Sequence, residues 1–194
     1  KIYLLYLKFC IFFKNFIMNN EEKKFNIAKQ LHLSGKIKES QKIYLDLSKI
    51  YKKNHILFCL IGTTFLQLKK FDEAINNFRT SIDLNSNFPE VYNNLGIALA
   101  EKEKYSEALV NYNKAIKLKN DYIDAYINRG ISLNKLGKFK DAISDFNFVI
   151  RTQPLNPKAY NNLGNVFKEL KNYDEAINSY DKAININQNY LEAI

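Results

Sequence analysis

Residues 89–122 read PEVYNNLGIALAEKEKYSEALVNYNKAIKLKNDY, and this stretch decides the fold. Its apolar residues recur at steps of three and four, first from Val91 to Leu99 and again from Tyr105 to Ile116. Such spacing predicts two amphipathic helices, each with one apolar face. The polar residues 101–104 between the two runs predict a short turn. The stretch is therefore predicted to be a hairpin of two antiparallel helices.

The same pattern recurs every 34 residues along most of the chain. Two registers show it most clearly: Gly62, Gly96, Gly130 and Gly164, and Ala74, Ala108, Ala142 and Ala176. Five units follow one another without insertion: 21–54, 55–88, 89–122, 123–156 and 157–190. Residues 191–194 would start a truncated sixth unit. One hairpin cannot bury its apolar groups alone, and stacking the next hairpin on it does so. We therefore predict an all-α solenoid of stacked antiparallel helix pairs.

A third register is aromatic and consists of Phe58, Tyr92, Tyr126 and Tyr160. Together with the pairs Leu95–Gly96 and Leu163–Gly164, it resembles the tetratricopeptide repeat (TPR) across residues 21–190. Arg129 departs from the family pattern at the leucine position. The resemblance implies a right-handed superhelix whose concave wall, formed by the first helix of each unit, binds extended peptides. The repeats are most similar to those of O-GlcNAc-transferase-type proteins and bacterial TPR proteins.

Asparagines gather on the face that the resemblance assigns to the groove. Four of them hold the sixth position of their units: Asn26, Asn94, Asn128 and Asn162. Three more lie on the same face: Asn93, Asn161 and Asn165. An amide both donates and accepts hydrogen bonds, so such a row can hold a peptide backbone whatever its side chains are. We predict these seven residues as peptide-binding and expect the sixth-position side chains to point into solvent. The alternative is that the row only reflects how common Asn is in this sequence.

The sequence contains no catalytic constellation. His32 and His55 have no metal ligands at a suitable spacing, and neither a Gly-rich phosphate loop nor a nucleophile elbow occurs. We therefore predict a non-enzymatic protein-interaction scaffold that needs no cofactor and no metal. The alternative is that these repeats are the N-terminal substrate-recruiting region of a larger enzyme, such as a glycosyltransferase of the O-GlcNAc type or another transferase.

The net charge of +9 raises the question of nucleic-acid binding. The basic excess lies almost wholly in residues 1–54, on a mixed-charge background, whereas a nucleic-acid groove needs a sustained basic track. The predicted partner is therefore a protein or peptide and not a nucleic acid. The two cysteines, Cys10 and Cys59, are too few for a disulfide framework, which favours the cytoplasm.

Residues 1–20 precede the repeats, and residues 2–17 are apolar and aromatic. Three interpretations stay open for this segment. Met18 is the true start and residues 1–17 come from upstream sequence, or the segment is a signal anchor or membrane-surface helix, or it is a native cap on the repeats. Only the second interpretation predicts contact with a membrane.

Overall fold

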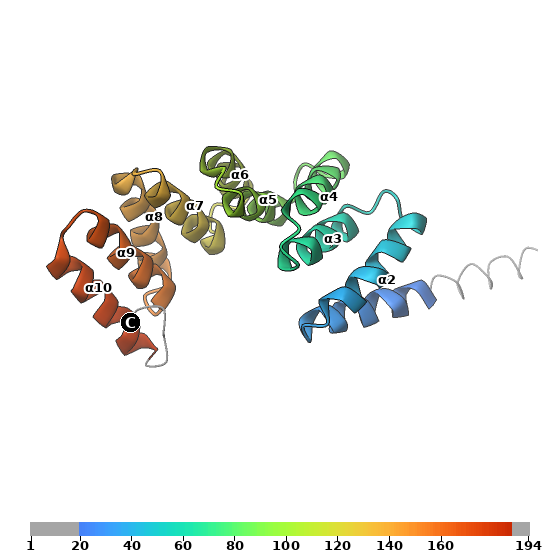
Figure 1. Cartoon of the computed structure of the whole chain (residues 1–194), viewed down its shortest axis with the longest axis horizontal. Coiled ribbons are helices and arrows are strands. Elements are labelled where there is room, and N and C mark those ends of the chain that lie inside the picture. Colours follow the sequence, from blue (N-terminus) through green and yellow to red (C-terminus); the bar gives the residue numbers. More distant parts are fainter. Residues whose placement is uncertain (1–19, 188–194) are drawn as a thin grey trace, which may run out of the picture. The chain divides into compact units, whose positions relative to one another are not determined.

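In the computed structural model, the described residues, 20–187, are helices joined by short links, and no strand occurs among them (Figure 1). The chain divides into two compact units, one ending at Asn85 and the other beginning at Ser86. These helices confirm the predicted all-α fold class. Their starts also keep the 34-residue step, since α3, α5, α7 and α9 begin at residues 55, 89, 123 and 157.

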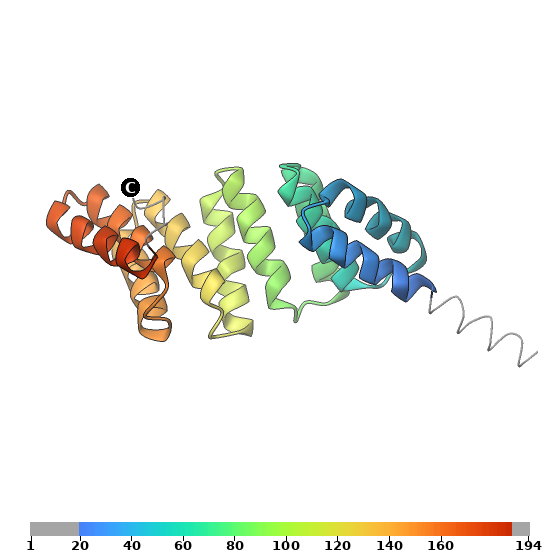
Figure 2. The same ribbon diagram turned by 90° about the horizontal axis from the view of Figure 1, so that it is seen from below.

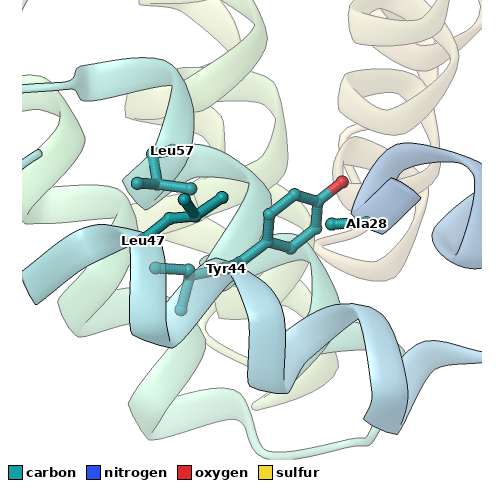
Figure 3. Packing of buried hydrophobic residues seen from close by; sticks show 5 residues of the cluster. Ala28, Tyr44, Leu47 and Leu57 are labelled. Atoms are coloured by element: carbon teal, nitrogen blue, oxygen red, sulfur yellow. The ribbon is translucent and has the colours of Figure 1, made fainter. Parts of the chain in front are cut away.

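The first unit begins with a helix over residues 20–33. It continues with α2 (Ile37–Ile50), α3 (His55–Gln67) and α4 (Phe71–Leu84). Its core joins three of these helices, because Ala28, Tyr44, Leu47, Leu57 and Ile61 form one buried cluster. Figure 3 shows the ring of Tyr44 lying between Ala28 on one side and Leu47 and Leu57 on the other. The apolar face of each helix is thus covered by its neighbours.

The second unit contains three helix pairs. They are α5 (Pro89–Glu101) with α6 (Tyr105–Leu118), α7 (Ile123–Lys135) with α8 (Phe139–Thr152), and α9 (Pro157–Glu169) with α10 (Tyr173–Ile186). Figure 2 shows α5 and α6 running side by side, and each pair also packs on the next one. A shared cluster carries the core from α7 and α8 into α9: Leu133, Ala142, Phe146, Leu163 and Val166.

Four of the five hairpins have a glycine that faces an aromatic ring, and the first has Ala28 at the equivalent position. The pairs are Gly62 with Phe78, Gly96 with Tyr112, Gly130 with Phe146, and Gly164 with Tyr180. A Cβ atom added to Gly96 would lie 2.5 Å from a ring carbon of Tyr112, which is shorter than any normal contact. The two helices of the hairpin therefore approach each other closely at Gly96. This close approach explains why glycine and an aromatic residue recur together in the sequence.

The link inside each hairpin adopts one backbone conformation. The residue two places after the first helix has a positive φ in all five cases: Gly35, Lys69, Glu103, Gly137 and Lys171. The turn is closed in the same way in different repeats, because the amide of Lys104 donates to the carbonyl of Leu99 and that of Lys138 to Leu133, both at 2.9 Å. Glycine adopts this conformation without strain, whereas lysine and glutamate do so at a cost.

The interpretations of residues 1–17, and the predicted sixth unit at residues 191–194, lie outside the described residues. Among the residues that are described, none of the helices has both the length and the apolar character that crossing a membrane requires. Cys59, by contrast, is described and is buried in α3.

Candidate functional site

The candidate site is the first-helix row of the second unit, defined here as helices α5, α7 and α9. Helix α5 lies beside α7, and α7 lies beside α9, so the three first helices form one continuous face. Six of the seven predicted peptide-binding residues lie on this row: Asn93, Asn94, Asn128, Asn161, Asn162 and Asn165. Asn26 is exposed on the helix over residues 20–33 and belongs to the first unit.

One pair of asparagines links two neighbouring repeats across this row. The side-chain amide of Asn128 on α7 donates to the Oδ1 atom of Asn93 on α5, with an N···O distance of 3.0 Å. Asn93 is only 4% exposed, so it lies in the packing between the repeats and not on an open surface. A buried amide without this bond would carry an unsatisfied oxygen. The pair therefore fixes the register of α7 on α5.

The same pair does not recur one repeat later. Ile127 holds the position of Asn93 on α7, and it packs in a small apolar cluster with Val149 and Ala159. Asn162, the counterpart of Asn128, therefore faces no amide and donates to the carbonyl of Lys158 in its own helix, at 2.8 Å. The predicted row is thus continuous in position, but its members have different partners.

The remaining predicted residues also differ in their surroundings. Asn165 accepts a hydrogen bond from the hydroxyl of Tyr180 at 2.9 Å, so its oxygen is engaged inside the α9–α10 hairpin. Asn94, Asn128 and Asn162 are half-buried. The expectation that these three side chains point into solvent was therefore wrong. The first-helix row is closely packed, and its amide side chains also help to hold neighbouring repeats together.

Two carbonyl oxygens on the row have no hydrogen-bond partner within the described part of the chain. They belong to Asn134 on α7 and Asn161 on α9, and both oxygens are inaccessible to solvent. Asn161 is 4% exposed, like Asn93. A buried acceptor without a donor costs about 1–3 kcal/mol. Asn134 was not among the seven predicted residues, although its place on this face could have indicated it.

A charge cluster joins α7 of this row to the second helix of its hairpin, α8. Arg129 donates through Nε and Nη2 to the two carboxylate oxygens of Asp145 at 2.8 and 2.6 Å, and through Nη1 to Asn113 at 2.7 Å. Its guanidinium also stacks over the ring of Tyr126, 5.1 Å from the ring centre. Burial raises the pKa of the Asp145 carboxyl, although the hydrogen bonds from Arg129 act in the opposite direction. Since both carboxylate oxygens are engaged, the cluster holds α7 to α8 and is not a catalytic pair.

The two histidines bind amide side chains. His32 Nε2 lies 2.8 Å from Gln67 Oε1, and His55 Nε2 lies 3.1 Å from Asn85 Nδ2. Across residues 20–187, no group of three or more His, Cys, Asp or Glu side chains is arranged to hold a metal ion. The ring nitrogens therefore connect helix ends within the first unit.

Comparison with known families identifies the repeat. The model of the tetratricopeptide repeat matches residues 157–190, and a second model, described as TPR repeat, matches residues 62–102 and 98–137. Together these matches cover more than half of the chain. The chain belongs to the tetratricopeptide repeat family. Among curated proteins, no sequence matches it.

Solved TPR structures share the fold at low sequence identity. YrrB, described as a TPR protein with an unusual peptide-binding site, is 21% identical with a TM-score of 0.70, and the alignment covers 88% of each chain. A thermophilic TPR protein of Thermus thermophilus is 18% identical with a TM-score of 0.75, covering 89% of this chain and 94% of its own. MamA of Desulfovibrio magneticus is 15% identical with a TM-score of 0.78, covering 88% and 97%. These likenesses confirm the TPR solenoid, whereas the similarity to O-GlcNAc-transferase repeats stays a prediction.

Proposed function

We propose that this TPR protein is a non-enzymatic interaction scaffold that binds an extended peptide segment of a partner protein along its first-helix row. TPR proteins in general bind protein or peptide partners, and YrrB is described as having a peptide-binding site. The observation that carries the proposal is the series of half-buried amides that runs along this row: Asn94 on α5, Asn128 on α7 and Asn162 on α9.

An extended peptide suits this surface because its backbone offers one N–H donor and one C=O acceptor at almost every residue. Amide side chains match both groups, so they bind the backbone without selecting its sequence. Exposed Ile131, on the same face as Asn128, adds an apolar contact beside the amides. The scarcity of cysteine supports a cytoplasmic scaffold, and its partner is a protein and not a nucleic acid. No observation on the described residues favours the alternative of an enzyme.

The proposal is tested by peptide selection followed by substitution. A phage-displayed library of random peptides is selected against the full chain, and the Kd of the best peptide is measured by calorimetry. Replacing Asn94, Asn128 and Asn162 together by Ala should weaken binding by about 2–4 kcal/mol, which is roughly 30- to 800-fold in Kd. Stability should fall by only about 1 kcal/mol, because Asn128 also holds Asn93.

A matched variant replaces three asparagines on the second helices instead, Asn111, Asn147 and Asn178, and should leave the Kd unchanged. Gly96→Leu serves as the packing control, since it overfills the contact with Tyr112 and should cost about 1–3 kcal/mol of stability or more. Equal loss of affinity in both asparagine variants, or no loss in the first, would overturn the proposal.

A further inference from the structure

The first unit contains a small cavity that no part of the proposed function uses. It has a volume of about 270 Å³ and lies where the helix over residues 20–33, the end of α2 and the start of α3 meet. Its apolar walls come from Phe25, Leu47, Tyr51 and Leu57, and its polar lining from Glu21, Glu22 and Asn54. The volume is below the range of about 300–1,000 Å³ typical of small-molecule sites, and suits a single side chain.

The floor and the rim of the cavity are held in place by the fold. Leu47 and Leu57 are almost completely buried in the core of the first unit, where they lie next to each other (Figure 3). The ring of Phe25 packs on Tyr44, with 6.0 Å between the ring centres. Asn54 caps α3 by accepting a hydrogen bond from the amide of Leu57. The cavity is therefore formed before any ligand arrives.

One polar group in this apolar cavity is incompletely satisfied. The side chain of Glu21 is only 10% exposed, and its Oε1 atom accepts a hydrogen bond from the ammonium group of Lys24 at 2.9 Å. Its Oε2 atom is buried and has no hydrogen-bond partner among the described residues. A buried carboxylate oxygen without a donor is costly, and a charged donor satisfies it best.

From this juxtaposition we infer that the cavity receives one lysine side chain of a partner protein, with the ammonium group on Glu21 Oε2. The methylene stem of a lysine would lie along the apolar walls while its charged end reaches the carboxylate. The rings of Phe25 and Tyr51 offer further attraction for a cation. The carboxylates of Glu21 and Glu22 against the single charge of Lys24 leave one negative charge for the ligand to neutralise.

Other ligand classes fit less well. An acidic side chain would add a third carboxylate to the cavity, and a purely apolar one would leave Oε2 of Glu21 without a donor. Lys52 and Lys53 stand in sequence between the lining residues Tyr51 and Asn54, but both are exposed, so solvent and salt screen their charges.

The test uses the full chain labelled with nitrogen-15 and a probe peptide, acetyl-Ala-Ala-Lys-Ala-Ala-amide. Titration should produce saturable chemical-shift changes at the backbone amides around the cavity, those of Phe25, Tyr51 and Leu57. A peptide with norleucine in place of lysine keeps the methylene stem and lacks the charge, and should bind at least about tenfold more weakly. Equal binding of the two peptides would overturn the inference.

Two substitutions separate a ligand site from a merely structural carboxylate. Glu21→Gln should weaken lysine binding by about tenfold or more, with the thermal midpoint recorded to show that the protein stays folded. Lys24→Met should instead strengthen binding by about threefold or more. It frees Oε1 of Glu21 for the ligand and removes the ammonium group that competes with the ligand. A Lys24→Met variant that binds no better than the natural protein would contradict the assignment.

Glu39→Gln provides the matched control, since Glu39 is an exposed carboxylate in the first turn of α2, and it should leave the affinity unchanged. The inference is independent of the proposed function. The variant with Ala at Asn94, Asn128 and Asn162 should bind the lysine peptide as the natural protein does, so failure at one site is distinguishable from failure at the other. Shifts that spread over the lysine-rich surface without saturating would also overturn the inference.

Discussion

The hairpins α5–α6 and α7–α8 have helices of the same lengths, 13 and 14 residues, but their interiors differ at equivalent positions. Leu95 is buried on α5 as an ordinary core residue. On α7 the equivalent residue is Arg129, which is paired with Asp145. At the position of Asp145, α6 has Asn111, whose amide bonds to its own helix. The charge on α7 is therefore matched by a second change on α8.

This difference shows what the repeat requires at the position that Leu95 and Arg129 share. A leucine is accepted there because it fills the space. An arginine is accepted because its guanidinium group pairs with the carboxylate of Asp145. The cost is visible at Asp145, where burial raises the pKa of the carboxyl despite the neighbouring guanidinium. Exchanging a buried ion pair for apolar residues is often neutral or stabilising, whereas removing one partner alone is not. The hairpins can thus be made alike, but only by changing both residues.

Arg129→Leu should have the largest effect of the variants that compare the two hairpins. It introduces the residue of α5 into α7 but leaves the carboxylate of Asp145, only 6% exposed, without its partner. We expect a loss of about 3–5 kcal/mol in the free energy of unfolding, measured by urea denaturation followed by circular dichroism. The loss should shrink as the pH falls, because a carboxyl whose pKa is raised in the folded state binds a proton on folding.

The double variant Arg129→Leu with Asp145→Asn recreates the residues of α5 and α6. Its free energy of unfolding should return to within about 1 kcal/mol of the natural value, because no unpaired charge is left. A double variant as unstable as the single one would show that the space on α7 suits only arginine.

The second prediction concerns the hydroxyl of Tyr112, the aromatic residue that faces Gly96 in the α5–α6 hairpin. Tyr112 forms a hydrogen bond with Ser132 of the next repeat, and its burial raises the pKa of the hydroxyl. On α8 the equivalent residue is Phe146, and Val166 holds the place of Ser132. Tyr112→Phe should therefore cost about 0.5–1.5 kcal/mol in the free energy of unfolding, as expected for one buried hydrogen bond.

The hydroxyl of Tyr44 is the natural control, since it is buried without a partner among the described residues and its pKa is raised to about 12 by burial. Tyr44→Phe should cost nothing in the same urea titration, or even stabilise the first unit. Similar losses for Tyr44→Phe and Tyr112→Phe would mean that the hydrogen bond with Ser132 does not cause the loss at Tyr112.

Much of this architecture could be predicted from the sequence, because it depends on residue spacing. The helix pairs, the turn between them and the close contact at Gly96 follow from periodicity and from side-chain size alone. The partners of the asparagines could not be predicted in this way. Asn93 and Asn128 pair because their side chains meet across two repeats, and Ile127 prevents the same pairing one repeat later. Periodicity gives the positions of such residues but not which of them are buried.

Arg129 illustrates the same limit. The sequence shows it only as a departure at the leucine position, and nothing in the 34-residue pattern connects it with Asp145, 16 residues later. The two meet because the long side chain of Arg129 reaches the carboxylate of Asp145, which depends on side-chain conformation and not on spacing. The cavity beside Glu21 could not be predicted from the sequence either, because its lining comes from three helices and from a carboxylate that only the packing buries.

The smallest expected effect comes from the turn inside the hairpins. Glu103 and Gly137 hold equivalent positions with φ angles of 59° and 70°, and both lie on the surface. Glutamate loses about 1–2 kcal/mol in this conformation, whereas glycine loses about 0.5–1 kcal/mol more backbone entropy on folding. Glu103→Gly should therefore raise the free energy of unfolding by about 0.5 kcal/mol. The reverse change, Gly137→Ala, should lower it by about 1 kcal/mol, although a Cβ there meets no atom within 4 Å. Because neither change alters a packing contact, opposite signs in matched urea titrations would isolate the backbone as the cause. Equal signs would show that these links differ in more than their φ angle.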